Sequence, residues 1–383
     1  MNPIHDKRIA VIGGGPGGLT LARLLQQGGA NVTVYERDKH RGVRVQGATL
    51  DLHEESGLAA LQKGGLMEAF EMHYRPGADL MRVVDRHATI RIDEHGEGKA
   101  YPSRRPEIDR GPLREILLDS LAGGTVIWDR QFVSMEPAGE GWALTFQDGH
   151  SAEADIVIAA DGAHSRIRPY ITEIRPFYSG VTTVEGSIYE SERSAPAMHA
   201  LLKGGKVFAL GDGKTLILSS KGDGSLVFYM GFNVEEHWWR DCGIDFADRI
   251  SVKRWFGDVF SGWDPVWEEL LEKCTLPLVV RPMYCMPLDQ EWTSLSNLTM
   301  LGDAAHLMPP YAGEGVNMAM LDALELSESL LNSAYPDVRS AIRAYEAGML
   351  VRASETARMT LEQTAAMHAD SGLDNMLSMF GHH

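Results

Sequence analysis

The residues best suited to chemistry stand where a hydrophobic segment gives way to a glycine-rich turn. Residues 298–301 are predicted to form a strand, and Asp303 follows that strand after a single glycine. The chain then turns through two prolines and enters a predicted helix that begins near Gly315. A carboxylate at a strand end can accept a hydroxyl proton, and the free N–H groups of a helix N-terminus bind an anion or a polar ring edge. This pattern suits a cofactor made of sugar hydroxyls and a diphosphate.

A second glycine-rich turn lies near the N-terminus, between a predicted buried strand and a helix of apolar spacing. Its Gly13, Gly15 and Gly18 form a G-x-G-x-x-G pattern in the setting that dinucleotide binding requires. The first glycine permits a tight turn, the second lets the backbone approach a diphosphate, and the third lets the helix pack close to the strand. A second predicted strand, residues 31–35, ends in Glu36, where an acid can bind a ribose hydroxyl. A turn without a ligand would leave Glu36 unexplained, so we predict a dinucleotide site.

A third motif, Asp161-Gly162, follows another predicted buried strand. It is either part of a cofactor or reductant site or an ordinary acidic turn. Asp303 is likewise either a cofactor ligand or a helix cap. His53 and His306 are interpreted as structural histidines, and no catalytic residue is assigned.

The elements that must position these motifs indicate an α/β protein. Strands and helices alternate around a Rossmann-like core, whereas period-two segments between residues 176 and 281 indicate an antiparallel sheet. One helix is expected over residues 54–70 and a long one over 337–368. The two predicted domains are interleaved in the sequence. The cofactor domain is predicted to comprise residues 1–80, 100–175 and 295–335, the substrate domain residues 81–99 and 176–294, and the C-terminal helix residues 336–383.

Composition restricts the partners of the chain. Its 383 residues and 42.2 kDa suffice to bury two joined cores. The net charge of −17 argues against nucleic acid or an anionic membrane surface as the main partner. No apolar run reaches membrane-spanning length and no signal-peptide pattern precedes the first strand, so a cytoplasmic location is expected. The 3 cysteines are too few and too scattered for a disulfide framework or a thiolate metal site.

Together, the glycine pattern, Asp161-Gly162 and Gly302-Asp303 resemble the three marker motifs of the class A flavoprotein monooxygenases, the FAD-dependent aromatic hydroxylases. Within that class, four segments are similar to the TetX tetracycline-inactivating monooxygenases: residues 34–38, 49–53, 126–130 and 302–310. The resemblance covers almost the whole chain. It implies a p-hydroxybenzoate-hydroxylase-like fold with one FAD and NADPH as reductant. It also implies that molecular oxygen, as a flavin C4a-hydroperoxide, hydroxylates an aromatic or polyketide-type small molecule, with tetracycline inactivation, and hence antibiotic resistance, among the candidates.

The resemblance also implies cofactor contacts. The glycine turn would hold the diphosphate, Glu36 the adenosine ribose, and Asp303 the ribityl chain or diphosphate. The backbone of residues 313–316 would face the pyrimidine edge of the isoalloxazine, where the positive end of a helix stabilises anionic reduced flavin. The implied FAD and reductant contacts are Gly13, Gly15, Pro16, Gly17, Gly18, Glu36, Arg37, Arg44, Asp51, Arg110, Asp161, Asp303, Gly313, Glu314, Gly315 and Val316.

Several of these assignments have plain alternatives. Arg37 could pair only with nearby acids, and Arg110 could be a solvated residue at a helix start. Arg44, implied near the flavin and the reductant, could be solvated as well. Asp51, implied near the isoalloxazine, could instead cap a turn.

The substrate side matches the TetX enzymes less closely. Where they carry a substrate-contacting Gln, Arg and His, the aligned residues here are Glu185, Lys206 and, nearby, Val227. The flavin contacts therefore carry over better than the tetracycline contacts. Met230 is weighed as a further pocket wall, but ordinary core packing is the favoured interpretation of it. The predicted substrate contacts are Glu185, Lys206, Phe208 and Tyr311.

Two other functions remain open at this point. One is an FAD-dependent reductase, dehydrogenase or halogenase on the same fold, although residues 237–240 lack the W-x-W-x-I-P pattern of flavin halogenases. The other is a flavin-binding or ligand-binding protein without turnover. A phenolic substrate would benefit from a base, and the sequence does not identify one. A monomer and a weak dimer both fit the sequence.

Overall fold

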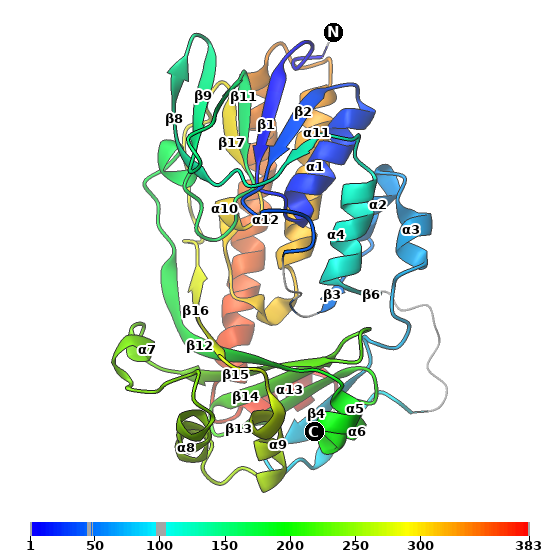
Figure 1. Ribbon diagram of the computed structural model, residues 1–383, viewed down its shortest axis with the longest axis vertical. Helices are drawn as coiled ribbons and strands as arrows, with labels where there is room; N and C mark the ends of the chain where they lie inside the picture. Colours follow the sequence, from blue (N-terminus) through cyan, green and yellow to red (C-terminus); the bar gives the residue numbers. More distant parts are fainter. Residues whose placement is uncertain (1, 44–46, 48, 97–104, 382–383) are drawn as a thin grey trace.

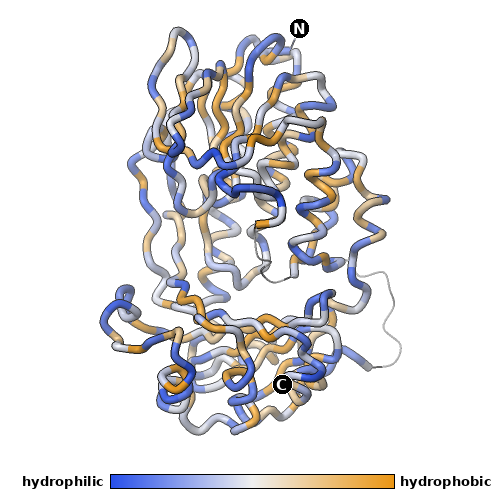
Figure 2. Tube along the Cα trace, in the orientation of Figure 1, coloured by the Kyte–Doolittle hydropathy of each residue, from blue (hydrophilic) through white to orange (hydrophobic). Residues whose placement is uncertain are grey.

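The computed structural model describes residues 2–43, 47, 49–96 and 105–381 (Figure 1). In this part of the chain, a five-stranded parallel sheet has the order β17-β11-β1-β2-β7. Figure 2 shows hydrophobic segments gathered among these strands, as expected for a parallel sheet covered on both faces. The strands are β1 (Arg8–Ile12), β2 (Asn31–Tyr35), β7 (Val126–Ile127), β11 (Ile156–Ala159) and β17 (Leu298–Met300).

Helices and a small antiparallel sheet complete this half of the molecule. Helix α11 packs between α1 and α12, and α4 packs beside α1. The sheet β10-β9-β8 contributes apolar side chains to the same core as the parallel strands. The helices are α1 (Pro16–Gln27), α4 (Arg110–Asp119), α10 (Asp303–His306), α11 (Gly315–Leu331) and α12 (Val338–Met367), with the 3-10 helices η1 (Arg168–Tyr170) and η3 (Pro310–Ala312); the strands are β8 (Phe132–Ala138), β9 (Gly141–Phe146) and β10 (Ser151–Ala154).

The other half is built on seven described strands in the order β16-β12-β15-β14-β13-β4-β5. Its pairs are antiparallel except β13 with β4. The strands are β4 (Met81–Asp85), β5 (Ile90–Asp93), β12 (Phe177–Ile188), β13 (Lys206–Gly211), β14 (Lys214–Ser220), β15 (Leu226–Asn233) and β16 (Val279–Cys285). Short helices accompany them: α5 (Ser191–Ser194), α6 (Pro196–Leu202), α7 (Trp238–Asp241), α8 (Arg249–Val259), η2 (Pro265–Glu268) and α9 (Glu269–Lys273).

The two faces of this sheet have different neighbours. One face packs its apolar side chains against α6, α8 and α9, around the buried Trp255 and Trp267. The other face is turned toward the half that contains the parallel sheet, with the two-stranded ladder of β3 (Thr49–Asp51) and β6 (Glu107–Asp109) between them (Figure 1). The second face is therefore the one that can line a site together with residues of the half that contains the parallel sheet.

The predicted long C-terminal helix is confirmed, and in the structure it joins the two halves. Helix α12 runs from the parallel sheet to the seven-stranded sheet (Figure 1). A further helix that the sequence did not suggest, α13 (Gly372–Met379), packs against β13 and β4. In the described residues no helix is both long and apolar enough to cross a membrane.

The single helix expected over residues 54–70 is wrong in its extent. The structure has two helices, α2 (Gly57–Lys63) and α3 (Met67–Glu71). Between them Gly65 has φ +70°, a left-handed conformation that ends a helix readily only at glycine. The apolar spacing continues across the break because both helices pack on the same cluster around Leu61 and Phe70.

Candidate cofactor and substrate site

The N-terminal glycine turn is shaped by close packing on one side and open space on the other. Gly13 has φ +116°, and a Cβ added there would lie 2.2 Å from the carbonyl oxygen of Ala160. A Cβ added at Gly18 would lie 2.1 Å from the carbonyl oxygen of Gly13, so β1 and α1 could not approach as they do. Gly15, the N-cap of α1, has no such neighbour within 4 Å. The free N–H groups at the start of α1 therefore have room for a diphosphate.

Glu36 lies at the end of β2, directly beside this turn. Its carboxylate accepts hydrogen bonds from the backbone N–H of Gly14 at 2.6 Å and of Asp38 at 2.9 Å. Glu36 is buried, and a Cβ at Gly14 would come within 2.8 Å of its Oε2. Arg37, the next residue, is exposed. Glu36 thus lies where a ribose bound at the glycine turn would be expected. Its contact with the ribose stays a prediction.

Asp303 opens α10 at the same edge of the sheet. Its carboxylate is exposed and accepts no hydrogen bond from the described residues. Protein atoms surround it on its other sides, and this partial desolvation raises the pKa of Asp303, against the charges of His306, Arg110 and Arg168. A carboxylate that is accessible and yet enclosed lies in a concave space. Its hydrogen-bonding capacity is available to a bound molecule.

A buried network holds the Asp303 turn from behind. The Asp322 carboxylate, 0% exposed, accepts hydrogen bonds from the Gly302 N–H at 2.9 Å and the His306 Nε2 at 2.5 Å. Arg352 of α12 pairs with the other oxygen of Asp322 at 2.9 Å. His306 therefore supports the turn and does not face the open space. This arrangement agrees with its interpretation as a structural residue.

Asp51, Gly313 and Glu314 meet where α11 begins. His53 joins the two acids: its Nε2 lies 3.1 Å from Asp51 Oδ2, and its Nδ1 lies 3.4 Å from Glu314 Oε2. A Cβ at Gly313 would come within 3.1 Å of Asp51 Oδ1, whereas Gly315 has no neighbour within 4 Å of its added Cβ. The turn is thus packed tightly against Asp51 and open at the helix N-terminus.

The remaining predicted cofactor residues lie in different settings. Arg110 opens α4, and its charge acts on the Asp303 carboxyl. The Oδ2 of Asp161 accepts a hydrogen bond from the Arg166 N–H at 2.8 Å, which is ordinary turn chemistry. The Oδ1 of Asp161 is buried and has no hydrogen-bond partner in the described chain, so a ligand role stays a prediction. Arg44 lies outside the described residues.

The predicted substrate residues share one face of the seven-stranded sheet. Phe208, Ile217, Tyr229 and Glu185 are direct cross-strand neighbours on β13, β14, β15 and β12, so their side chains point to the same side. Lys206 precedes Phe208 by two residues and shares that side. This is the face turned toward the cofactor residues.

Tyr311 approaches the same face from η3. It packs in the cluster that contains Phe208 and Ile217. Its hydroxyl lies 3.2 Å from the Nε2 of His368, the residue that follows α12. The structure therefore brings together the four predicted substrate residues, which lie 126 positions apart at most in the sequence (311 − 185 = 126).

Both charged members of this group have protein partners. The Lys206 ammonium pairs with Glu107, whose side chain is only 1% exposed, and Glu185 pairs with Arg281, whose side chain is 53% exposed. Sequence reasoning missed Glu107 and Arg281, because a partner on another strand leaves no local signal. Core packing, the favoured interpretation of Met230, is confirmed: its side chain points to the opposite face and is buried in the apolar core there.

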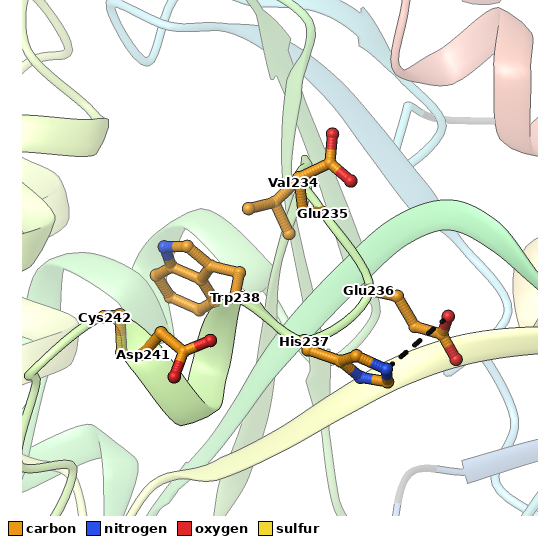
Figure 3. Close-up of a pocket in the computed structure, with 7 residues that line it drawn as sticks. All are labelled: Val234, Glu235, Glu236, His237, Trp238, Asp241 and Cys242. Atoms are coloured by element: carbon orange, nitrogen blue, oxygen red, sulfur yellow. Dashed lines mark ion pairs between the residues drawn. The ribbon is translucent and has the colours of Figure 1, made fainter.

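A surface hollow of about 500 Å³ at α7 lies away from this site. Figure 3 shows its lining, with a Glu236–His237 ion pair of 4.0 Å and Trp238 beside it. None of the predicted cofactor or substrate residues lines it. The described residues also contain no group of three or more His, Cys, Asp or Glu arranged to hold a metal ion.

The glycine cradle, the accessible Asp303 and the open start of α11 fit a flavin dinucleotide. A family model for the FAD binding domain matches residues 6–199 and 291–359, which include all three features. The chain belongs to this FAD-binding family. Its members include a 3-amino-4-hydroxybenzoate 2-monooxygenase of Streptomyces platensis, 30% identical over 95% of this chain and 89% of that protein. Our chain is accordingly an FAD-dependent monooxygenase.

Solved structures of this family share the fold. Klebsiella pneumoniae HpxO, crystallised with FAD and uric acid, superposes with a TM-score of 0.76 at 22% identity, covering 98% of this chain and 92% of that one. The tetracycline destructase Tet(51) superposes with a TM-score of 0.69 at 19% identity, covering 96% and 91%. The predicted class A, p-hydroxybenzoate-hydroxylase-like architecture is confirmed.

Proposed function

We propose that this family member hydroxylates an electron-rich aromatic or heteroaromatic small molecule, using NAD(P)H and molecular oxygen. The observation that supports it most is the meeting of two surfaces at η3 and the start of α11. On one side are Asp303 and the open glycines of the FAD half. On the other is the polar and aromatic sheet face with Phe208, Tyr229 and Glu185. A substrate held on that face would lie against the cofactor.

The chain's residues would orient the substrate between these surfaces. Bound FAD, once reduced, supplies activated oxygen. Phe208 and Ile217 offer an apolar wall for a ring. Arg281 presents a half-exposed guanidinium whose orientation is fixed by Glu185. A guanidinium in this position suits a carboxylate or another anionic oxygen on the substrate.

We further propose His368 as a proton acceptor on the substrate face. The Nδ1 of His368 lies 2.8 Å from the carbonyl oxygen of Thr364, which can only accept, so Nδ1 carries the proton. The Nε2 lone pair then faces two hydroxyls, that of Tyr311 at 3.2 Å and that of Thr215 at 3.3 Å, and burial lowers the pKa of His368 and favours the neutral ring. A substrate hydroxyl could therefore pass its proton to the Tyr311 oxygen while Tyr311 passes its own to His368.

The electron donor follows from the family resemblance and the sequence. FAD takes the G-x-G-x-x-G turn, so a nicotinamide cofactor would bind without a Rossmann domain of its own. We propose NADPH, with NADH as the alternative to be tested, and a cytoplasmic location where both are present. One chain supplies every residue of the proposed site, which suits a monomer or weak dimer.

Tetracyclines are a second substrate class, supported by the four TetX-like segments of the sequence. The Tet(51) likeness bears on the fold alone. Of the residues aligned with the tetracycline contacts, Glu185 puts an acid where those enzymes have a neutral Gln, and both Glu185 and Lys206 are held in ion pairs, with Arg281 and Glu107. A small anionic ring fits this face better than a large neutral polyketide.

The test is substrate-dependent oxygen insertion. Purified yellow protein is mixed with NADPH or NADH and oxygen, in the presence of 3-amino-4-hydroxybenzoate, uric acid or a tetracycline. Products are analysed by mass spectrometry for the gain of one oxygen atom. An Arg281→Gln variant should raise KM for the anionic compounds, whereas Arg193→Gln, an exposed substitution outside the site, should not. Flavin reduction without oxygen insertion into any compound would favour the reductase alternative.

A further inference from the structure

His53 is held between two carboxylates that come from different parts of the chain. Asp51 lies on β3, and Glu314 immediately precedes α11. The two ring nitrogens lie 3.1 Å from Asp51 Oδ2 and 3.4 Å from Glu314 Oε2, and the His53 side chain is only 4% exposed. The Nε2 contact is a hydrogen bond in which the ring donates, because a carboxylate only accepts, and the Nδ1 contact is a longer ion pair. A carboxylate at each ring nitrogen favours the doubly protonated imidazolium.

A buried asparagine fixes the frame around that ring. Asn317 of α11 is 0% exposed, and its Oδ1 accepts hydrogen bonds from the His53 N–H at 2.9 Å and the Ser56 hydroxyl at 3.2 Å. Its Nδ2 donates to the Asp51 carbonyl at 2.8 Å. These bonds tie β3 and the start of α2 to the first turn of α11. The position of His53 is thus set by hydrogen bonds between Asn317 and the backbone, as well as by the two ion pairs of the ring.

The ion-paired group lies directly against the open cofactor turn. A Cβ at Gly313 would meet Asp51 Oδ1 at 3.1 Å, and the start of α11 has open space at Gly315. Along the sheet edge, the ribose acid and glycine turn belong to β2 and β1, whereas Asp303 follows β17. A dinucleotide bound along this edge would run toward α11, and its redox ring would then lie beside Asp51 and Glu314.

We propose that His53 is a positioning residue for the flavin: its positive charge holds Asp51 and Glu314 together and offsets their charge beside the ring. The inference depends on the FAD assignment and not on the substrate. Reduced flavin is anionic, so uncompensated carboxylates next to it oppose reduction, and the desolvated setting strengthens that effect. The imidazolium offsets one of the two negative charges, so reduction is opposed less than it would be beside the carboxylates alone.

Among the described residues, the other charges near the group do not replace His53. Lys206 of β13 acts on Asp51 but is paired with Glu107 of β6. Arg105 lies 3.9 Å from Asp51 Oδ2, at the outer limit of an ion pair. Burial works against the charged ring, but Asp51 and Glu314 outweigh it and raise the pKa of His53 to about 9. His53 is therefore charged at neutral pH.

The test measures the reduction potential of bound FAD by equilibration with a reference dye, without substrate. His53→Gln should make reduction harder by about tenfold or more in equilibrium constant, equal to a drop of roughly 30 mV for a two-electron couple. Glu314→Gln alone should make reduction easier. The double variant should recover most of the loss, because the net charge of the group returns from −2 to the wild-type −1, now carried by Asp51. His73→Gln, an exposed histidine bonded to the Ala69 carbonyl, is the matched control and should change nothing.

The possible outcomes distinguish a failure of the proposed His53 role from a failure of the FAD assignment. An unchanged potential in His53→Gln, or a loss that the double variant does not relieve, would overturn the charge role and leave a structural histidine. If His53→Gln does not retain FAD, the Glu314→Gln potential decides alone. A wild-type protein without FAD would instead contradict the cofactor assignment, whereas absence of hydroxylation with a normal potential would contradict only the proposed substrate reaction.

Discussion

Asp303 and Glu36 are both acids at strand ends, but they are placed differently. Glu36 is buried and accepts two backbone N–H bonds, whereas Asp303 is exposed and accepts none from the described residues. Only the second carboxylate has its full hydrogen-bonding capacity available to a bound molecule. Its loss should therefore act on the cofactor more than on the fold.

We expect Asp303→Ala to weaken FAD binding. A hydrogen bond to a charged group contributes about 1.5–3 kcal/mol, which corresponds to roughly 10- to 100-fold in affinity. The measurement is fluorescence titration of the apoprotein with FAD. Asp258→Asn, an exposed acid on α8, is the control and should bind FAD as the wild type does. Full flavin occupancy and activity in Asp303→Ala would contradict the assignment.

The Tyr311–His368 pair predicts how kcat/KM changes at acid pH. Burial lowers the pKa of His368, so the ring is neutral at pH 7 and loses its capacity to accept a proton as pH falls. With a phenolic substrate, kcat/KM should fall at low pH. In His368→Gln the rate should instead follow ionisation of the substrate itself and rise toward higher pH. Tyr311→Phe should behave in the same way, and His199→Gln, outside the site, should keep the wild-type profile. Identical profiles in all variants would exclude the proton path.

His53 carries a prediction about alkaline pH. Its pKa rises from 6.5 to about 9 on folding, so the protonated ring stabilises the folded state fully below pH 6.5. This contribution is lost as pH rises through 9. The melting temperature of the apoprotein should fall over that range more in the wild type than in His53→Gln. Parallel curves would show that the ring is not charged in the folded protein.

At the scale of elements, two glycines of the turn between β1 and α1 have different roles: one is needed for folding and the other for cofactor binding. Gly18 is required by packing, whereas Gly15 faces open space. Gly18→Ala should lower the free energy of unfolding by about 1–3 kcal/mol, because the helix must move away from the strand. Gly15→Ala should leave the stability of the apoprotein unchanged and weaken FAD binding, because its Cβ enters the cofactor space. Urea unfolding and FAD titration on both variants test this, and equal effects of the two would contradict it.

At the scale of the molecule, the two halves are joined at two places beside the site. Lys206 pairs with Glu107, and the Gly222 N–H donates to Asp109 at 2.8 Å. At the far end of α12, Asn233 donates to the His368 carbonyl at 2.8 Å. These contacts set the separation between the sheet face and the cofactor turn.

We expect Lys206→Met to destabilise the protein by about 3 kcal/mol, because it leaves the buried Glu107 carboxylate without its partner. Adding Glu107→Gln should recover much of that loss, since no buried charge remains. Urea unfolding of the single and double variants provides the measurement. Lys253→Met, an exposed lysine on α8, is the control and should cost less than about 1 kcal/mol. If Lys206 contacts substrate instead, Lys206→Met should raise KM without loss of stability.

The sequence by itself determined the cofactor half to a large extent. Gly13, Gly15, Gly18, Glu36 and Asp303 act through local geometry, in which a strand, a turn and a helix N-terminus follow one another along the chain. Such patterns can be recognised without knowledge of the fold, because the residues that shape the turn are neighbours in sequence. The long C-terminal helix and the α/β class are predictable for the same reason, since hydrophobic periodicity is local.

Only the tertiary structure decided which side chains share the substrate face and which charges are paired. Glu107 with Lys206, Glu185 with Arg281, and His53 between Asp51 and Glu314 join residues from separate strands and helices. A pairing of this kind depends on strand order and register, and a shift of one residue would turn each side chain to the other face. For that reason the sequence could not show that Met230 faces the apolar core or that His53 lies between two acids.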